Sequence, residues 1–247
     1  HLKLLIDFIM DNHTKIGTPK PIKNYFEDVS YHNLENMKEK TEYIPEEVVE
    51  QLLYAIDDLN SDYQRILLTM MNSGLRYKEV QYLDYDCIKY DAKENVWILK
   101  FIPWKVLESR RHHGLSDYHE IVINETIAQE INKQRSFVKE LMLVSGLNHL
   151  FIHEVGGYKV GLYDSRGFNN AVNRIIKKHN IKTKDGELWK FTSKQCRKTF
   201  AVDAITNGAK PIEISYMLGH NSEYTTHRYY AEVRQMKLAQ LNAEFFK

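Results

Sequence analysis

The hydrophobic pattern of this sequence changes its period twice, and the order of those periods limits the fold that the chain can adopt. Before residue 86, apolar side chains recur at the spacing of helices. Pro45 stands in the first turn of one helical segment, and a second covers residues 62–72 and stops at Gly74. Over residues 86–124 the spacing becomes that of strands, and helical spacing then returns.

Two segments in the middle of the chain are candidate strands, Val96–Ile102 and Tyr118–Ile123. The connection between them is long, polar and basic. Ser193 and Pro211 are start signals for later helices. The helical patterns after the strands cover residues 125–143, 165–179, 193–206, 211–217 and 231–245. We therefore expect a mainly α fold that carries one small antiparallel β-sheet.

The 247 residues suffice for one large domain, or for one domain and part of another. Residues 1–36 hold one helical stretch and a turn-rich passage, which is too little to bury a core. The charged residues 37–44 are expected to form a linker, and residues 45–247 the main domain. Since the chain begins at His1 without an initiator Met or a signal-peptide pattern, we take it to be a fragment of a longer protein.

The composition, with 43% hydrophobic and 27% charged residues, is ordinary for a globular protein in water. The apolar runs are short and broken by charge, so we expect no membrane span. The two cysteines, Cys87 and Cys196, are too few for a disulfide framework or a four-cysteine zinc site. A reducing cytoplasm is the compartment that this cysteine usage favours.

The net charge of +1 would argue against a nucleic-acid partner if only the total mattered, but the distribution of charge matters more. Residues 174–210 carry only three acidic side chains, Asp185, Glu187 and Asp203. The same segment carries ten basic side chains: Arg174, Lys177, Lys178, Lys182, Lys184, Lys190, Lys194, Arg197, Lys198 and Lys210. Such a local excess suits a surface that faces phosphates, although a solvated helix face would have a similar composition.

Three short motifs contain most of the candidate site residues. SGLRYKEV contains Arg76, KQCRKTFA contains Lys194 and Arg197, and LGHNSEYTTHRYY contains His220 and Tyr229. In order and spacing these motifs resemble the tyrosine recombinase (phage integrase) family, and the resemblance covers about residues 43–247. Each motif is weak by itself, since an isolated Arg is most often a surface salt bridge. Together they imply a recombinase catalytic domain, preceded in residues 1–36 by the C-terminal remnant of a core-binding domain.

The resemblance implies a reaction, the cutting and rejoining of DNA through a 3′-phosphotyrosyl link without metal or other cofactor. Tyr229 would be the nucleophile, because it follows His220 at the family's interval. Arg76 and Arg197 would hold the non-bridging phosphate oxygens, a task that suits the planar guanidinium. His220 would donate a hydrogen bond to the phosphate. Tyr230 is the rival of Tyr229, but neighbouring residues of a helix point about 100° apart, so only one can face the arginines.

The resemblance also implies a lysine of the sheet hairpin as the general acid for the leaving oxygen. Lys105, at the end of the segment Val96–Trp104, occupies the matching place, with Lys100 as the rival. Lys194 stands where most relatives have His and some have Lys, and Lys198 stands where many have His. A lysine is a poor base near neutrality, because its unperturbed pKa is about 10.4. Which group takes the proton of Tyr229 therefore stays open.

Other interpretations are weaker. His112 and His113 are neighbours whose side chains diverge, and no cysteine or carboxylate frame surrounds them. The turn-rich carboxylates Asp84, Asp86 and Asp91 would suit a metal-dependent nuclease only poorly. A catalytically silent DNA-binding regulator of the same fold and a type IB topoisomerase are the alternative functions.

The resemblance also implies partners. These are double-stranded DNA and a homotetramer that acts on two DNA sites, as an integrase or transposase of a mobile element on the bacterial nucleoid. The chain also resembles transposon-borne members of the family from low-GC bacteria. Leu238, Leu241 and Phe245 lie at helical spacing and would dock either on a neighbouring protomer or on the chain's own domain.

Overall fold

The computed structural model describes residues 2–24, 41–156 and 159–219 of the chain. The chain divides into two compact units, residues 1–40 and 41–247. The first unit contains helix α1 (Leu2–Ile16). Asn24 donates to the Asp7 carboxylate at 2.6 Å and so ties the segment after α1 back to that helix.

The second unit begins with helices whose ends follow local signals. These are α2 (Glu46–Tyr54), the short 3₁₀ helix η1 (Ile56–Asp58), α3 (Ser61–Ser73) and α4 (Tyr77–Gln81). The Asn60 side chain caps α3 by accepting from the Tyr63 amide at 2.8 Å. Gly74 ends α3 in the left-handed conformation, with φ of 67°. The expected helices at 45 and at 62–72 are therefore present.

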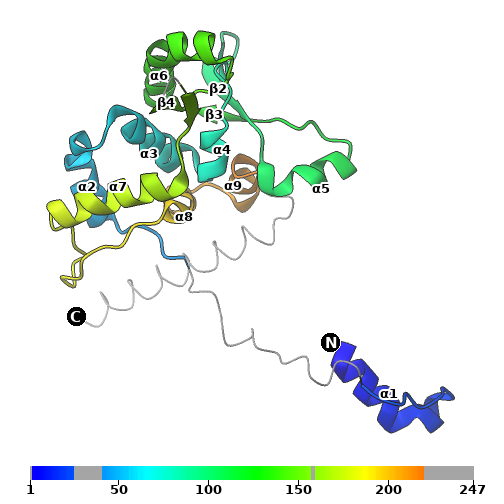
Figure 1. The fold of residues 1–247 in the computed structure, drawn as a ribbon. Helices are drawn as coiled ribbons and strands as arrows, with labels where there is room; N and C mark the ends of the chain where they lie inside the picture. Colours follow the sequence, from blue (N-terminus) through cyan, green and yellow to red (C-terminus); the bar gives the residue numbers. More distant parts are fainter. Residues whose placement is uncertain (1, 25–40, 157–158, 220–247) are drawn as a thin grey trace. The chain divides into compact units, whose positions relative to one another are not determined.

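Three antiparallel strands form a sheet in the order β1-β2-β3: β1 (Ile88–Asp91), β2 (Val96–Phe101) and β3 (His119–Ile123). Leu99 lies opposite Ile121 and both are buried, whereas Lys100 lies opposite Glu120 on the other face. The β2–β3 connection is no simple hairpin. It contains the 3₁₀ helix η2 (Trp104–Val106) and helix α5 (Leu107–His112), which projects from the body of this unit (Figure 1).

Four further helices follow in the described part of the unit: α6 (Glu125–Ser145), α7 (Ser165–Lys178), α8 (Ser193–Thr206) and α9 (Pro211–Met217). Their bounds agree with the helical patterns in the sequence. A second sheet of two strands, β4 (Ile152–Gly156) and β5 (Lys159–Leu162), was not expected. The expected helix at residues 231–245 lies outside the described residues. The fold is thus mainly α with small antiparallel sheets, as predicted.

A large apolar core joins most of these elements, and a smaller cluster packs the C-terminal part of α8 against α9. Helix α3 packs against both α6 and α8, and its side chains Ile66, Leu67 and Met70 are fully buried. Leu99 and Phe101 of β2 enter the same core from the sheet. None of the helices that the structure describes is long and apolar enough to cross a membrane.

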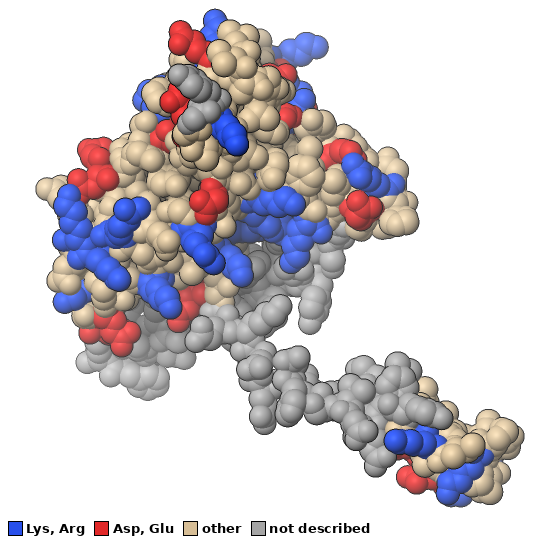
Figure 2. Space-filling model, in the orientation of Figure 1, with Lys and Arg blue, Asp and Glu red and all other residues tan. Residues whose placement is uncertain are grey.

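Lys and Arg side chains gather over α7 and the turn that follows it, within the basic segment noted in the sequence (Figure 2). Part of this charge is paired inside the unit. Lys178 and His179 both contact Asp58, and the Lys184 ammonium lies 3.8 Å from the Glu47 carboxylate. The segment therefore mixes structural ion pairs with exposed cations.

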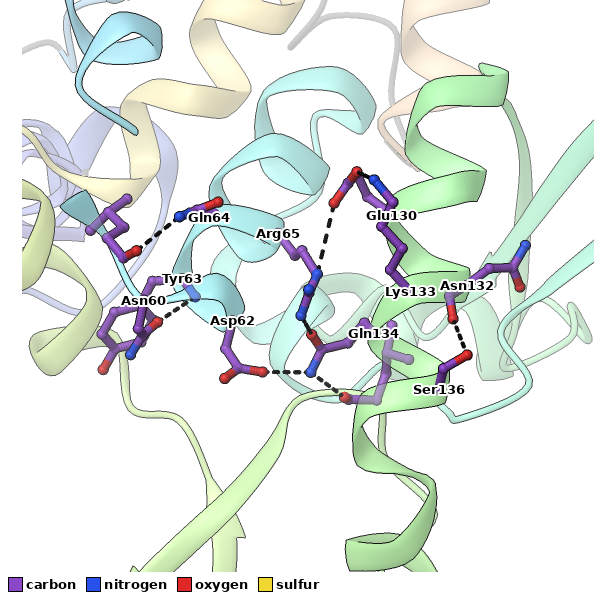
Figure 3. A network of polar contacts seen from close by, with 12 residues as sticks. Asn60, Asp62, Tyr63, Gln64, Arg65, Glu130, Asn132, Lys133, Gln134 and Ser136 are labelled. Carbon is purple, nitrogen blue, oxygen red and sulfur yellow. Dashed lines mark hydrogen bonds and ion pairs between the residues drawn. The ribbon is translucent and has the colours of Figure 1, made fainter. Parts of the chain in front are cut away.

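A buried polar network fixes α3 against α6 (Figure 3). Gln134 donates to Asp62 at 2.6 Å and accepts from Arg65 at 2.7 Å. The Tyr163 hydroxyl donates to the second oxygen of Asp62 at 2.8 Å. Buried polar groups that keep their partners make a packing arrangement specific. This network therefore helps to hold α3, whose C-terminal end carries the turn to Arg76.

Candidate active site

Arg76 occupies the N-cap position of α4, immediately after the turn that Gly74 makes at the end of α3. The carboxylate of Glu79 holds it in two ways. It accepts from the Arg76 backbone amide at 2.7 Å and from the Arg76 guanidinium at 2.7 Å. The Arg76 side chain is still 26% exposed, so it combines a fixed position with access to solvent.

Arg197 lies in the second turn of α8 and its side chain is only 10% exposed. Its guanidinium donates to the Gly74 carbonyl oxygen at 2.9 Å and to the Leu218 carbonyl oxygen. Gly74 belongs to the α3–α4 turn, and Leu218 follows α9. A single side chain on α8 therefore joins two segments that are far apart in sequence.

The Glu79 side chain lies between the two arginines and is 1% exposed. One carboxylate oxygen contacts Arg76, and the other lies 3.6 Å from the Arg197 guanidinium. A buried carboxylate is costly unless it is paired, and two neighbouring guanidinium groups repel each other. Glu79 therefore offsets the repulsion and keeps both cations in one place.

The chain after α9 reaches the same place. An added Cβ at Gly74 would lie 2.6 Å from Leu218, so the α3–α4 turn and the end of α9 are in close contact. Gly219, with φ of 59°, lies beside His119 of β3 and Pro103 of the β2–β3 connection. The LGH motif therefore begins next to both Arg197 and the edge of the sheet.

His119 fixes that meeting point. Its ring nitrogen Nε2 lies 2.6 Å from the Tyr216 carbonyl oxygen, which is an acceptor, so Nε2 carries a proton and donates. Burial lowers the pKa of His119, and the positive charge of Arg110 lowers it further, although the carbonyl of Tyr216 opposes the shift. The neutral ring is thus favoured, and it pins the end of α9 to β3.

The two candidates for the general acid lie in different surroundings. The Lys100 ammonium lies 4.4 Å from the ring centre of Tyr118, on the sheet face away from the core. Lys105 is exposed on η2, two residues after Pro103, which contacts the region of Gly219. Lys105 as the general acid stays a prediction. The strand expected at Val96–Ile102 ends one residue earlier, at Phe101, and the chain then turns into η2.

Lys194 is exposed in the first turn of α8, three positions before Arg197. His220, Tyr229 and Tyr230 lie outside the described residues, as does the proposed docking segment at residues 238–245. The structure thus brings together Arg76, Arg197 and the start of the LGH motif. The role of Glu79 as their common partner was not predicted, since it depends on contacts between α4 and α8.

A metal site and a cysteine nucleophile have little support among residues 2–24, 41–156 and 159–219. They contain no group of three His, Cys, Asp or Glu side chains that could hold a metal ion. Cys196 is fully buried, and burial raises the pKa of its thiol to about 12. This thiol therefore stays protonated near neutrality and is a poor nucleophile.

Comparison with known proteins gives a consistent result. The model of the phage integrase family matches residues 42–236. Transposase B from transposon Tn554 of Staphylococcus aureus strain Mu50 is 26% identical over 211 residues, which cover 85% of this chain. Transposase B from PsiTn554 of the same species is 25% identical over 190 residues, or 77% of this chain. The chain spans about 30% of the length of the curated relatives it matches.

Solved structures share the fold at low sequence identity. The XerH site-specific recombinase, bound to a palindromic difH substrate after cleavage, has a TM-score of 0.63 and 15% identity, covering 98% of this chain and 64% of that one. The Tn1549 transposon integrase, in complex with transposon right end DNA, has a TM-score of 0.58 and 15% identity, covering 98% and 84%. Since the family model covers most of the sequence, the chain belongs to the phage integrase family, the tyrosine recombinases.

Proposed function

We propose that this protein is a site-specific DNA recombinase, an integrase or transposase of a mobile element. One observation carries the proposal: two guanidinium groups from α4 and α8 are held together on the buried carboxylate of Glu79. Two fixed cations side by side suit the equatorial oxygens of a phosphodiester in its pentacoordinate state. The start of the LGH motif lies at the same place.

The reaction is a transesterification. The phenolic oxygen of Tyr229 forms a bond to phosphorus and gives up its proton to a base, whose identity the scheme leaves open. The bond from phosphorus to the 5′ oxygen breaks, and its electron pair stays on that oxygen. Lys105 supplies the proton that makes the oxygen a 5′-hydroxyl, while His220 donates a hydrogen bond to the phosphate. The 3′-phosphotyrosyl link stores the bond energy, so a 5′-hydroxyl of another strand can attack it and rejoin the DNA.

Arg76 and Arg197 supply the charge in this scheme. Both act on charge that develops in the transition state, where a fixed donor is most effective. Lys194 lies one turn before Arg197 and adds a positive charge at the same end of α8. The scheme assigns no step to a metal ion or to another cofactor.

The names of the relatives support an activity on DNA. The Tn554 relatives are transposases, and the XerH and Tn1549 proteins were solved with DNA. For this chain we infer double-stranded DNA as the partner and a homotetramer on two DNA sites. In this arrangement residues 238–245 dock on a neighbouring protomer or on their own domain. Residues 1–36 would be the end of a core-binding domain, joined by residues 37–44 to the catalytic domain, and the assembly would act on the nucleoid.

The test begins with the DNA target. Covalent protein–DNA junctions are mapped in cells that express the intact protein, and the mapped site is rebuilt as a duplex nicked next to the cleavage position. Loss of the short fragment then traps the covalent intermediate. The proposal requires a trapped adduct. Specific binding without any adduct would identify a silent regulator, and relaxation of supercoiled DNA by dilute monomer would identify a topoisomerase.

A further inference from the structure

Lys105 lies on a connection that its own backbone holds only weakly. The segment from Ile102 to Tyr118 is far longer than an ordinary hairpin loop. Next to Lys105, the Trp104 amide donates to the Ile102 carbonyl oxygen in a γ-turn, and the Val106 amide donates to the Pro103 carbonyl oxygen in a 3₁₀ turn, both at 2.9 Å. Such turns have poor hydrogen-bond geometry. A side chain must therefore help to fix the direction of Lys105.

The C-terminal part of the β2–β3 connection is held by contacts between its own residues. Arg110 donates to the carbonyl oxygens of Ser116 and Tyr118, at 3.0 and 3.1 Å. Arg111 pairs with Asp117 at 2.8 Å. These contacts close the loop that follows α5. They do not include the residues of η2, so they leave the position of Lys105 to contacts nearer the strand.

The side chain of Trp104 supplies contacts of this kind, with residues of α4 and its C-cap. Its ring packs edge-on against Tyr82, with ring centres 5.4 Å apart. The Lys78 ammonium lies 4.9 Å from the centre of the same ring. Lys78 is in α4 and Tyr82 is its C-cap, and the N-cap of this short helix is Arg76. Trp104 therefore connects the segment that carries Lys105 with α4, the helix whose N-cap is Arg76.

The indole N–H of Trp104 shows which part of the side chain matters. The Nε1 atom is buried and has no hydrogen-bond partner among the residues that the structure describes. A buried donor without a partner costs stability, so tryptophan is a poor choice at this position unless its ring is needed. The face and edge of the ring make the contacts with Lys78 and Tyr82.

We infer that Trp104 is a positioning residue that sets the place of Lys105 relative to Arg76. This inference rests on the proposed function, in which Lys105 protonates the leaving 5′ oxygen. Without the indole ring, Pro103 and Leu107 still anchor the connection, since both are buried. The fold then survives, but η2 loses its contact with α4. Proton donation should suffer more than binding or nucleophilic attack.

The test compares two substrates of the intact protein. One duplex has the normal oxygen at the scissile 5′ position, and the other has a bridging sulfur. A thiolate leaves without protonation, so the sulfur substrate does not need the acid. The quantity measured is the single-turnover rate of adduct formation on sulfur divided by that on oxygen. Defects in DNA binding affect both rates and cancel in the ratio.

Lys105→Ala should raise this ratio by about 10²–10⁴, the usual contribution of a general acid. Trp104→Ala should raise it by about tenfold to a hundredfold, since a displacement of about 1 Å has effects of that size. Trp104→Phe keeps a ring for Lys78 and Tyr82 and should bring the ratio back to within about threefold of the original protein. Trp104→Leu, which keeps apolar volume without a ring, should behave as Trp104→Ala and replaces it if that variant is insoluble.

Trp97→Ala is the matched control. Trp97 lies on β2, contacts Tyr90 with its ring and donates to Glu125 at 2.9 Å, away from η2. Its loss should lower stability and leave the ratio unchanged. If Lys105→Ala raises the ratio and both Trp104→Ala and Trp104→Leu do not, the positioning role of Trp104 is wrong while the proposed acid stands. If Lys105→Ala leaves the ratio unchanged, the acid assignment fails, and the inference fails with it.

Discussion

Arg76 and Arg197 share one carboxylate, that of Glu79, although they lie on different helices. One oxygen of Glu79 is 2.7 Å from the Arg76 guanidinium, and the other is 3.6 Å from the Arg197 guanidinium. The same carboxylate also binds the backbone amide of Arg76. Glu79 thus fixes the separation of the two cations before any phosphate binds, which is the condition for preorganised charge stabilisation.

Glu79→Gln should destabilise the protein strongly. The substitution keeps the shape of the side chain but removes the charge that offsets two guanidinium groups, one of them buried. Breaking a buried ion pair by removing one partner costs about 3 kcal/mol or more. Urea unfolding of the two proteins measures this difference. Glu130→Gln is the control, because Glu130 pairs with Arg65 near the surface at 3.7 Å and should cost less than about 1 kcal/mol.

Arg76→Lys and Arg197→Lys should each reduce adduct formation by about 10²–10³, the usual effect of removing one fixed donor. A lysine keeps the positive charge but offers no planar pair of donors. The measurement is the single-turnover rate on the nicked duplex at saturating protein. Arg65→Lys serves as the control, since Arg65 belongs to the network around Gln134. If both site variants cleave at nearly the original rate, the arginines do not clamp the phosphate.

Local sequence signals predicted the longer helices well. Ser193 and Pro211, the start signals noted in the sequence, are the first residues of α8 and α9. The arrangement of periods also predicted the order of helices and sheet.

Contacts between residues far apart in the chain could not be predicted from the sequence. Two of the partners of Arg197 are the backbone carbonyls of Gly74 and Leu218, which any residue type would supply. The chain leaves β2 one residue before the predicted end and turns into η2, where Trp104 packs on Tyr82, a contact that no periodicity in the sequence indicates. Strands β4 and β5 are short and contain glycines, although the dipeptide Gly156-Gly157 is a hairpin signal in the sequence.

Tyr229→Phe should abolish the covalent adduct while DNA binding persists. The change removes the attacking oxygen and keeps the aromatic ring. Adduct is measured on the nicked duplex by denaturing electrophoresis, and binding is measured by a mobility shift. Tyr230→Phe is the matched control and should retain adduct formation. Adduct that persists in Tyr229→Phe and disappears in Tyr230→Phe would transfer the nucleophile to Tyr230.

Excess EDTA should leave the rate of adduct formation by pure protein unchanged. In the proposed scheme the phosphate charge is stabilised by Arg76 and Arg197, and a guanidinium needs no metal to act. The single-turnover rate is compared before and after dialysis against chelator. A loss of activity that added Mg²⁺ restores would contradict the scheme.

Protonation of His119 should destabilise the protein in mildly acidic solution. Because burial lowers the pKa of His119 below its ordinary value of about 6.5, the unfolded chain binds this proton more readily than the folded protein does. The stability that the neutral ring contributes is therefore complete above about pH 6.5 and is lost as the pH falls toward the lower folded value. Urea unfolding between about pH 5 and 7 should show a free energy that rises with pH.

His119→Gln should make that dependence weaker. A glutamine amide can still donate to the Tyr216 carbonyl oxygen, which the His119 ring contacts at 2.6 Å, but it takes up no proton. The difference between the original protein and the variant isolates the contribution of this side chain from those of other groups. Equal slopes in the original protein and His119→Gln would mean that His119 titrates alike in the folded and unfolded states.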